Sequence, residues 1–180
     1  MAYKGQYTVK NPKKYLGDPE KVIYRSHWER EVMMFLDENE NVLEWGSEEI
    51  AIPYDNPVRG GQSRYFPDFI IKMNEGPIKI VEVKPAKQTV KPEQPKRRTQ
   101  KYIQEVATWV INSEKWRAAR ELCERNEMDF EIWTEHTLKD LGLLKASIRP
   151  GEKKILSESK RPKMKPIAKR KPRPRPTRRS

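Results

Sequence analysis

Two short runs of apolar residues, with a turn between them, stand out in the middle of the chain. The runs 69–73 and 78–84 are rich in β-branched residues and flank Asn-Glu-Gly-Pro, which predicts an antiparallel hairpin. Alternate residues of a strand share a face, so Glu82 and Lys84 should project together. Asp68 begins the first strand and should lie beside them, at the adjacent ends of the hairpin.

The segments before this hairpin show one helical repeat and several turn signals. Apolar residues recur at helical spacing from Trp28 to Leu36, after Ser26, a residue type that commonly begins helices. The predicted elements are an irregular arm over residues 1–21, a helix to about Asn39, short strands over 42–45 and 50–54, and a loop over 55–63.

Beyond the hairpin, prolines exclude a helix until about Lys96. The predicted elements are a helix over about 98–111, an interruption at Asn112-Ser113, a second helix begun by Ser113, a strand over 128–133, and a short helix begun by Thr134 and ended by Gly142. This order predicts an α/β fold, with a single domain over residues 22–144.

Basic residues are concentrated in the last 36 residues. Residues 145–180 hold 15 of the 38 Lys and Arg but only 2 of the 26 acidic residues, so they carry +13 while residues 1–144 carry −1. Six prolines and few large apolar residues predict that this tail is disordered when free. A polycation of this kind favours a partner with a phosphate backbone, and a solubility tail is the alternative.

Several classes of site are excluded by their missing motifs. The sequence contains no G-x-x-x-x-G-K-[ST] phosphate loop, and its two histidines, His27 and His136, have no Cys or His at zinc-ligand spacing. The single cysteine, Cys123, falls on the apolar side of a predicted helix and is expected to be a core residue. No run reaches the roughly 20 apolar residues that cross a bilayer.

The hairpin ends combine residue types that suit metal-assisted hydrolysis. Two carboxylates, Asp68 and Glu82, can bind a hard divalent cation such as Mg²⁺, with Mn²⁺ as the alternative. The ammonium of Lys84 can oppose charge that develops on a phosphate. The competing interpretation is that Glu82 and Lys84 form an ordinary charge pair on an exposed strand.

Glu29 has two interpretations. Ser26 and Glu29 match the S-x-x-E capping box, in which the carboxylate only closes the start of the helix. The alternative is that this helix-borne carboxylate belongs to the hairpin site.

Pro67-Asp68 and Glu82-Val83-Lys84 resemble the PD and (D/E)xK motifs of the PD-(D/E)xK nuclease superfamily. The resemblance implies a restriction-endonuclease-like αβββαβ core with a mixed sheet flanked by helices. It also implies that Asp68, Glu82 and the Val83 carbonyl bind metal, that Lys84 acts on the attacking water, and that Glu29 completes the catalytic set. Gln104, on the helix predicted over about 98–111, is a further candidate, because the superfamily often carries a polar residue near the metal on this helix.

Three stretches, Tyr24–Glu29, Arg64–Asp68 and Val81–Pro85, are similar to the head completion nucleases of tailed bacteriophages. Transposon-end endonucleases share the acidic residues and the lysine more loosely. The resemblance implies a DNA endonuclease that acts on the packaged DNA end before tail joining, beside portal and neck proteins. It also implies a location in the host cytoplasm during assembly and then in the virion.

Basic residues near the hairpin and in the tail are the predicted DNA contacts, although charged runs are more often solvated surface. They are Arg25, Arg64, Lys87, Lys96, Arg97, Arg98, Lys169, Arg170, Lys171, Arg173 and Arg175. Two alternatives to a phage nuclease remain at this point. One is a non-catalytic DNA-binding or neck protein on a nuclease fold, and the other is a transposition endonuclease subunit.

Overall fold

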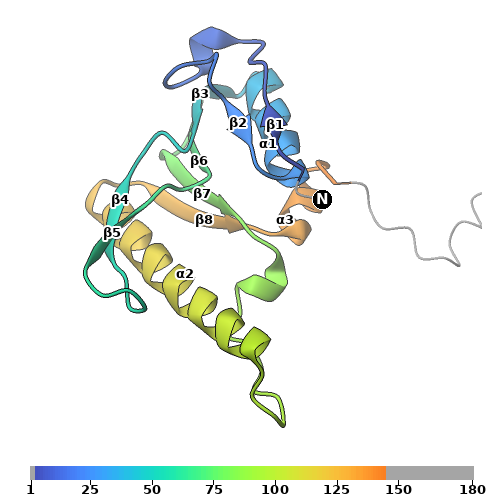
Figure 1. Ribbon diagram of the computed structural model, residues 1–180. Helices are drawn as coiled ribbons and strands as arrows, with labels where there is room; N and C mark the ends of the chain where they lie inside the picture. The colour runs from blue at the N-terminus through green and yellow to red at the C-terminus, as the bar shows by residue number, and fades with distance from the viewer. Residues whose placement is uncertain (1–2, 145–180) are drawn as a thin grey trace, which may run out of the picture. The chain divides into compact units, whose positions relative to one another are not determined.

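The computed structural model describes residues 3–144 and shows a four-stranded sheet with helices on both faces (Figure 1). The elements are β1 (Gly5–Gln6), the 3-10 helix η1 (Pro12–Lys14), β2 (Ile23–Tyr24), α1 (His27–Glu38), β3 (Val42–Ser47), β4 (Ile52–Asp55), β5 (Gln62–Tyr65), β6 (Phe69–Met73), β7 (Lys79–Val83), the 3-10 helix η2 (Ala86–Gln88), α2 (Gln100–Arg125), β8 (Asp129–Trp133) and α3 (Glu135–Asp140).

The main sheet has the strand order β3-β6-β7-β8. Its first two pairings are antiparallel and β7 pairs with β8 in parallel, so α2 serves as the crossover between the last two strands. The hairpin of β6 and β7 forms as predicted, with Phe69 opposite Val81. The expected α/β class and mixed sheet are confirmed.

The two faces of β7 pack against different layers. Val81 and Val83 lie in a core with α1, whereas Ile80 lies in a second core with α2 and the β4–β5 hairpin. Strand alternation therefore directs Glu82, which follows Ile80 by two residues, toward the α2 side of the sheet.

The segment predicted as a loop over residues 55–63 contains part of a strand. Gln62–Tyr65 pairs with Ile52–Asp55 to form a separate two-stranded ribbon, β4–β5. The prediction was wrong here because Gln62, Ser63 and Arg64 are all polar. In the structure the half-buried Ser63 and the buried Tyr65 alternate with the exposed Gln62 and Arg64, as in a half-exposed strand. Ile52, Tyr54 and Tyr65 pack toward α2.

The two helices predicted around Asn112-Ser113 are one continuous helix, α2, of 26 residues. Thr99 begins it, since its hydroxyl accepts a hydrogen bond from the Tyr102 N–H at 3.2 Å. The expected N-cap, Ser113, instead donates to the Trp109 carbonyl one turn earlier, at 2.9 Å. A serine that satisfies its hydroxyl in this way can remain inside a helix.

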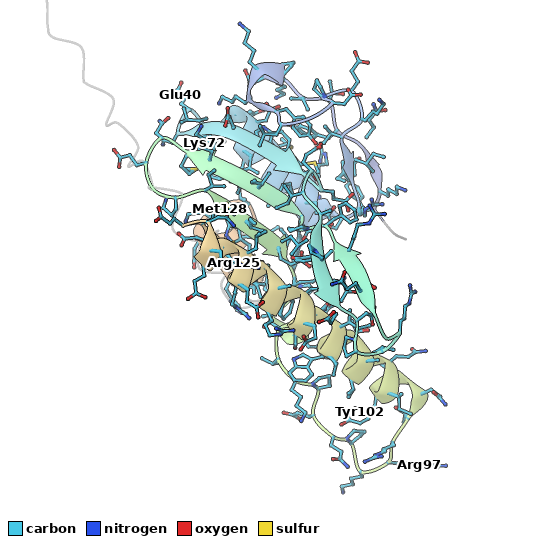
Figure 2. All side chains as sticks on the ribbon, turned by 90° about the vertical axis from the view of Figure 1, so that its left-hand side faces the viewer. Glu40, Lys72, Arg97, Tyr102, Arg125 and Met128 are labelled. Carbon is cyan, nitrogen blue, oxygen red and sulfur yellow. The ribbon has the colours of Figure 1, made fainter. Side chains whose placement is uncertain are left out.

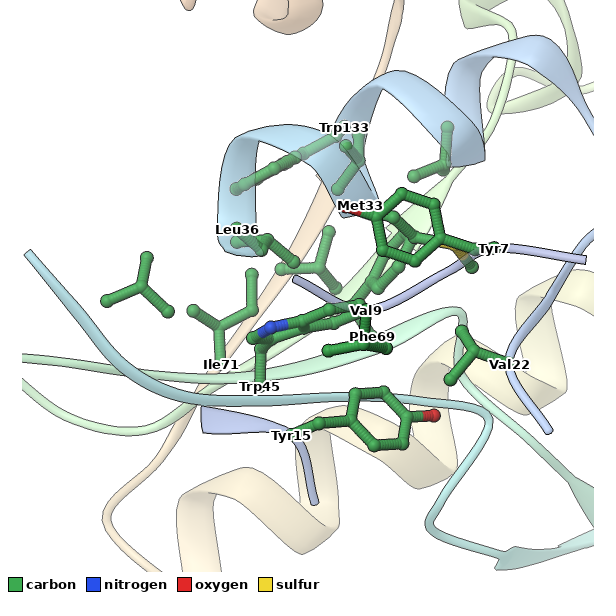
Figure 3. Packing of buried hydrophobic residues seen from close by; sticks show 14 of the residues in the cluster. Tyr7, Val9, Tyr15, Val22, Met33, Leu36, Trp45, Phe69, Ile71 and Trp133 are labelled. Atoms are coloured by element: carbon green, nitrogen blue, oxygen red, sulfur yellow. The ribbon is translucent and has the colours of Figure 1, made fainter. Parts of the chain in front are cut away.

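The N-terminal stretch over residues 3–21 belongs to the core. Its backbone is mostly irregular, as expected, but it includes β1 and η1, and Tyr7, Val9 and Tyr15 are buried. The rings of Tyr7 and Tyr15 lie against Trp45 of β3, with centroids 6.1 and 4.8 Å away (Figure 3). This packing was missed because the three residues are widely spaced in a polar sequence.

A buried carboxylate anchors the same stretch. Asp37, near the end of α1, is fully buried and accepts hydrogen bonds from the Tyr7 hydroxyl at 3.0 Å and from the backbone N–H of Lys10 and Asn11 at 2.7 and 3.0 Å. Three donors compensate the cost of removing this carboxylate from water. The arm is therefore held by both apolar packing and hydrogen bonds.

The last elements agree with the prediction. Thr134 begins α3, and Gly142 follows it with a φ of 74°, a conformation that suits glycine. None of the helices within residues 3–144 is long and apolar enough to span a membrane. The predicted basic tail, with Lys169, Arg170, Lys171, Arg173 and Arg175, lies outside the described residues, and the domain boundaries at 21 and 144 stay predictions.

Candidate active site

Asp68 lies beside the end of β7. It directly precedes β6, and its Oδ2 accepts a hydrogen bond from the Val83 N–H at 2.6 Å. The pairing of Phe69 with Val81 brings these two segments together. The hairpin thus fixes Asp68 against the segment that carries Glu82, as the strand pattern predicted.

Lys84 and Glu82 form an ion pair on the same face, with Nζ 2.9 Å from Oε1. The Glu82 side chain is only 5% exposed and that of Lys84 is 27% exposed, so the pair is not the solvated surface pair of the competing interpretation. The Lys84 N–H donates to the Trp133 carbonyl at 3.0 Å, which continues the alignment of β7 with β8. Backbone pairing therefore orients both side chains.

Tyr65 is a third partner of this pair, and the sequence interpretation missed it as a site residue. Its hydroxyl donates to Glu82 Oε2 at 2.7 Å in a buried position. The ammonium of Lys115 lies 5.5 Å from the Tyr65 ring centroid, so α2 supports the tyrosine from the other side. The three polar residues of β5 that precede Tyr65 gave no signal in the sequence that could have located it.

Glu29 closes the start of α1 and also affects the site electrostatically. Its Oε2 accepts from the Arg25 N–H at 2.7 Å and its Oε1 from the Ser26 hydroxyl at 2.8 Å, while the Glu29 N–H donates to Ser26 Oγ at 3.1 Å. The charge of Glu29 contributes to the raised pKa values of Asp68 and Lys84. The hydrogen bonds support the capping role, and the catalytic role of Glu29 stays a prediction.

Comparisons with known proteins identify the family of this chain. Residues 39–135 match the family described as "TnsA-like endonuclease N terminal", a segment that includes Asp68, Glu82 and Lys84. The chain belongs to this TnsA-like endonuclease family. Among proteins with assigned names, the head completion nuclease of Enterobacteria phage T4 is 40% identical to it over 146 residues, which are 79% of this chain and 97% of the phage T4 protein.

Membership in the TnsA-like family confirms the predicted resemblance to PD-(D/E)xK nucleases and identifies a DNA-hydrolysing enzyme. The superfamily generally uses divalent metal ions. Within residues 3–144, no group of three Asp, Glu, His or Cys side chains forms a metal cluster, so a metal would rest on the Asp68 and Glu82 pair and on backbone or water oxygens.

The electrostatics of the site fit such an ion. Burial, followed by the charge of Glu82, raises the pKa of Asp68 well above its usual range, against the effects of Lys84 and the Val83 N–H. Burial lowers the pKa of Lys84, but Glu82 and Asp68 outweigh it and the net shift is upward. The single lysine does not balance the two carboxylates, and a divalent cation held by their oxygens would.

The predicted DNA-binding residues within residues 3–144 lie in different parts of the structure, and they do not form one patch. Arg25 forms a two-point ion pair with Glu48, with Nε–Oε1 2.9 Å and Nη2–Oε2 2.6 Å. Arg64 is exposed on β5, and Lys96, Arg97 and Arg98 are exposed before α2, where Figure 2 shows Arg97 on a loop at the end of the molecule. Lys87 and Gln104 line one cleft.

Replacing Tyr65 with phenylalanine should impair catalysis while Asp68, Glu82 and Lys84 remain in the site. The change Tyr65→Phe leaves Glu82 Oε2 buried without its donor, which should lower the free energy of unfolding by about 1–3 kcal/mol. Loss of this orienting contact should also reduce kcat by about 10- to 100-fold with a small change in KM. Denaturant unfolding and steady-state cleavage measure the two effects.

The matched control is Tyr54→Phe on the neighbouring strand. Tyr54 also lies under Lys115, but its hydroxyl accepts from the Asn56 side chain at 3.2 Å instead of contacting Glu82. Tyr54→Phe should keep kcat near the wild-type value. An equal loss of kcat in both variants would show that Tyr65 acts only through stability.

Proposed function

We propose that this protein hydrolyses DNA phosphodiester bonds with Mg²⁺, or Mn²⁺ in its place, held by Asp68, Glu82 and the Val83 carbonyl. The observation that carries the proposal is the convergence of Asp68, Glu82 and Lys84 at the hairpin ends, with Asp68 bonded to the Val83 N–H and Lys84 to Glu82. A divalent ion there would lower the pKa of a bound water and offset charge on the phosphate.

The protein's own residues orient the reacting groups. The Val83 N–H fixes one oxygen of Asp68, and Tyr65 fixes one oxygen of Glu82. The ammonium of Lys84, held by Glu82, orients or activates the water and opposes negative charge as it develops. These contacts restrict the side chains before substrate arrives, which reduces the reorganisation needed during reaction.

The similarity to the phage T4 head completion nuclease, which extends over 97% of that relative, supports a proposal for the biological setting. We propose that the protein acts in phage head completion, on the packaged DNA end before the tail joins. Its protein partners would be portal and neck components, and it would reside in the host cytoplasm during assembly and later in the virion. A transposition endonuclease subunit is the second candidate, because the matching family description is TnsA-like.

A cleavage assay tests the function. The purified full-length chain is incubated with linear, circular and overhang-bearing DNA, with Mg²⁺ or with a chelator. We expect cleavage only with the metal, and none by Asp68→Asn, which keeps the volume of the side chain but removes the charge. DNA binding without cleavage under every condition would instead favour a non-catalytic protein, and dependence on a partner recombinase would favour transposition.

Glu29→Gln separates the two roles of Glu29. The amide keeps one oxygen for the Arg25 N–H or the Ser26 hydroxyl but removes the charge felt at Asp68 and Lys84. We expect cleavage to fall by about 10- to 100-fold with little change in thermal stability. The control is Glu31→Gln on the same helix, which should cleave normally. Normal cleavage by Glu29→Gln would leave it with the capping role alone.

A further inference from the structure

A cleft of about 710 Å³ lies between the segment that follows β7 and the first turns of α2. Its lining combines the indole of Trp109 and the apolar side chains of Val90 and Pro92 with three lysines and two glutamates, namely Lys87, Lys91, Lys101, Glu93 and Glu105. Lys101 and Glu105 form an exposed pair, with Nζ 4.0 Å from Oε1, and such a pair is weak enough to leave the ammonium to a phosphate. Val90 is 60% exposed, so its apolar surface is accessible to a ligand. The cleft therefore offers an aromatic face and cations in one place.

The ammonium of Lys91 covers the Trp109 ring and is held there only weakly. Lys91 Nζ lies 5.9 Å from the Trp109 ring centroid. A cation–π contact at an exposed site contributes less free energy than stacking of a nucleobase on an aromatic side chain. A base can therefore displace the Lys91 ammonium from the ring, and the displaced cation is then close enough to pair with the phosphate of the same nucleotide.

The segment that contributes one side of the cleft is basic and follows the candidate active site in the sequence. Residues 85–101 follow Lys84 directly and contain six Lys or Arg and one acidic residue, Glu93. The start of this segment is fixed, since the Ala86 N–H donates to Glu135 Oε2 at 2.7 Å and the Thr89 hydroxyl to the Ala86 carbonyl at 2.8 Å. The cations of this segment favour binding of a DNA strand close to the site.

We propose that this cleft binds an unpaired base of the DNA substrate, stacked on Trp109, with the neighbouring phosphates on Lys87, Lys91 and Lys101. Within a duplex both faces of a base are covered by its neighbours, so only a single-stranded or frayed nucleotide can present a face to the indole. The inference rests on the proposed nuclease function and adds a substrate class to it, namely DNA with an unpaired strand near the cutting site.

The test compares binding of a short fluorescein-labelled oligothymidylate and a blunt duplex of equal length to the full-length protein. A chelator is present throughout, so the outcome does not depend on cleavage. Trp109→Leu should weaken oligothymidylate binding by about 5- to 150-fold and duplex binding by less than about twofold. The matched control is Phe130→Leu, which alters another aromatic ring under a cation, Arg120, at 5.6 Å, and should affect neither probe.

A second variant keeps the proposal testable if Trp109→Leu does not fold. Trp109→Phe keeps an aromatic face, so it should bind oligothymidylate within about threefold of wild type while losing part of the tryptophan quenching that binding causes. The proposal would be overturned if Trp109→Leu weakened the binding of oligothymidylate and of duplex by factors that differ less than about threefold. It would also be overturned if tryptophan quenching on binding were unchanged in Trp109→Phe.

Discussion

Glu82→Gln should lower Mg²⁺-dependent cleavage by about 10³-fold or more, because an uncharged amide is a poor ligand for a hard divalent cation. The amide oxygen can still accept from the Tyr65 hydroxyl, but the amide nitrogen cannot accept from Lys84. The free energy of unfolding should therefore fall by about 1–3 kcal/mol while the fold is retained. Single-turnover cleavage at saturating Mg²⁺ and a denaturant titration measure the two changes.

The neighbouring strand provides a control for this variant. Glu131 on β8 is also paired with a lysine, Lys79, and accepts from the Trp133 indole N–H at 2.7 Å. Glu131→Gln should therefore cost stability but leave cleavage unaffected. Wild-type Mg²⁺-dependent activity in Glu82→Gln would contradict the assignment of Glu82 to the metal.

Deleting residues 145–180 should weaken DNA binding strongly at low salt while the chemistry survives. The deleted segment carries +13 and the remaining 144 residues carry −1. If half a dozen tail cations contact phosphates, the slope of log affinity against log salt should become shallower by roughly five units on duplex DNA. Cleavage at saturating protein should persist, since Asp68, Glu82 and Lys84 all lie in the retained part.

A tail with the same composition in shuffled order is the control for the deletion. It should restore both the affinity and the salt slope, because neutralisation of phosphates depends on charge and little on sequence. A salt slope that is unchanged by the deletion would show that the tail contacts something other than DNA. An acidic surface of a partner protein would then be the next candidate.

The hairpin could be predicted from the sequence because everything that forms it is local. A turn and two strands separated by a few residues determine which way Glu82 and Lys84 point and place Asp68 beside them. The contact of Tyr65 with Glu82 spans 17 residues and depends on a ribbon whose strand β5 has three polar residues. Its polar pattern alone gave no reason to expect that strand.

The helix α2 was divided in error because Asn112 and Ser113 are residues that often flank helices. In the structure Asn112 is buried and Ser113 bonds to the Trp109 carbonyl, so the surrounding packing decides the outcome. The same limit applies to the N-terminal stretch, where Tyr7 and Tyr15 have their partners some 30 residues away. Propensity and periodicity do not report contacts of that range.

The packing of the N-terminal stretch determines where this chain can be divided. A fragment beginning at residue 22 would lack Tyr7, Val9 and Tyr15, whose burial stabilises a protein by about 1.5–3 kcal/mol for each large apolar side chain. It would also leave the Asp37 carboxylate without its donors. Losses of that size approach the whole stability of a typical domain, about 5–15 kcal/mol. Residues 3–21 are therefore unsuited to trimming, even though most of them are polar.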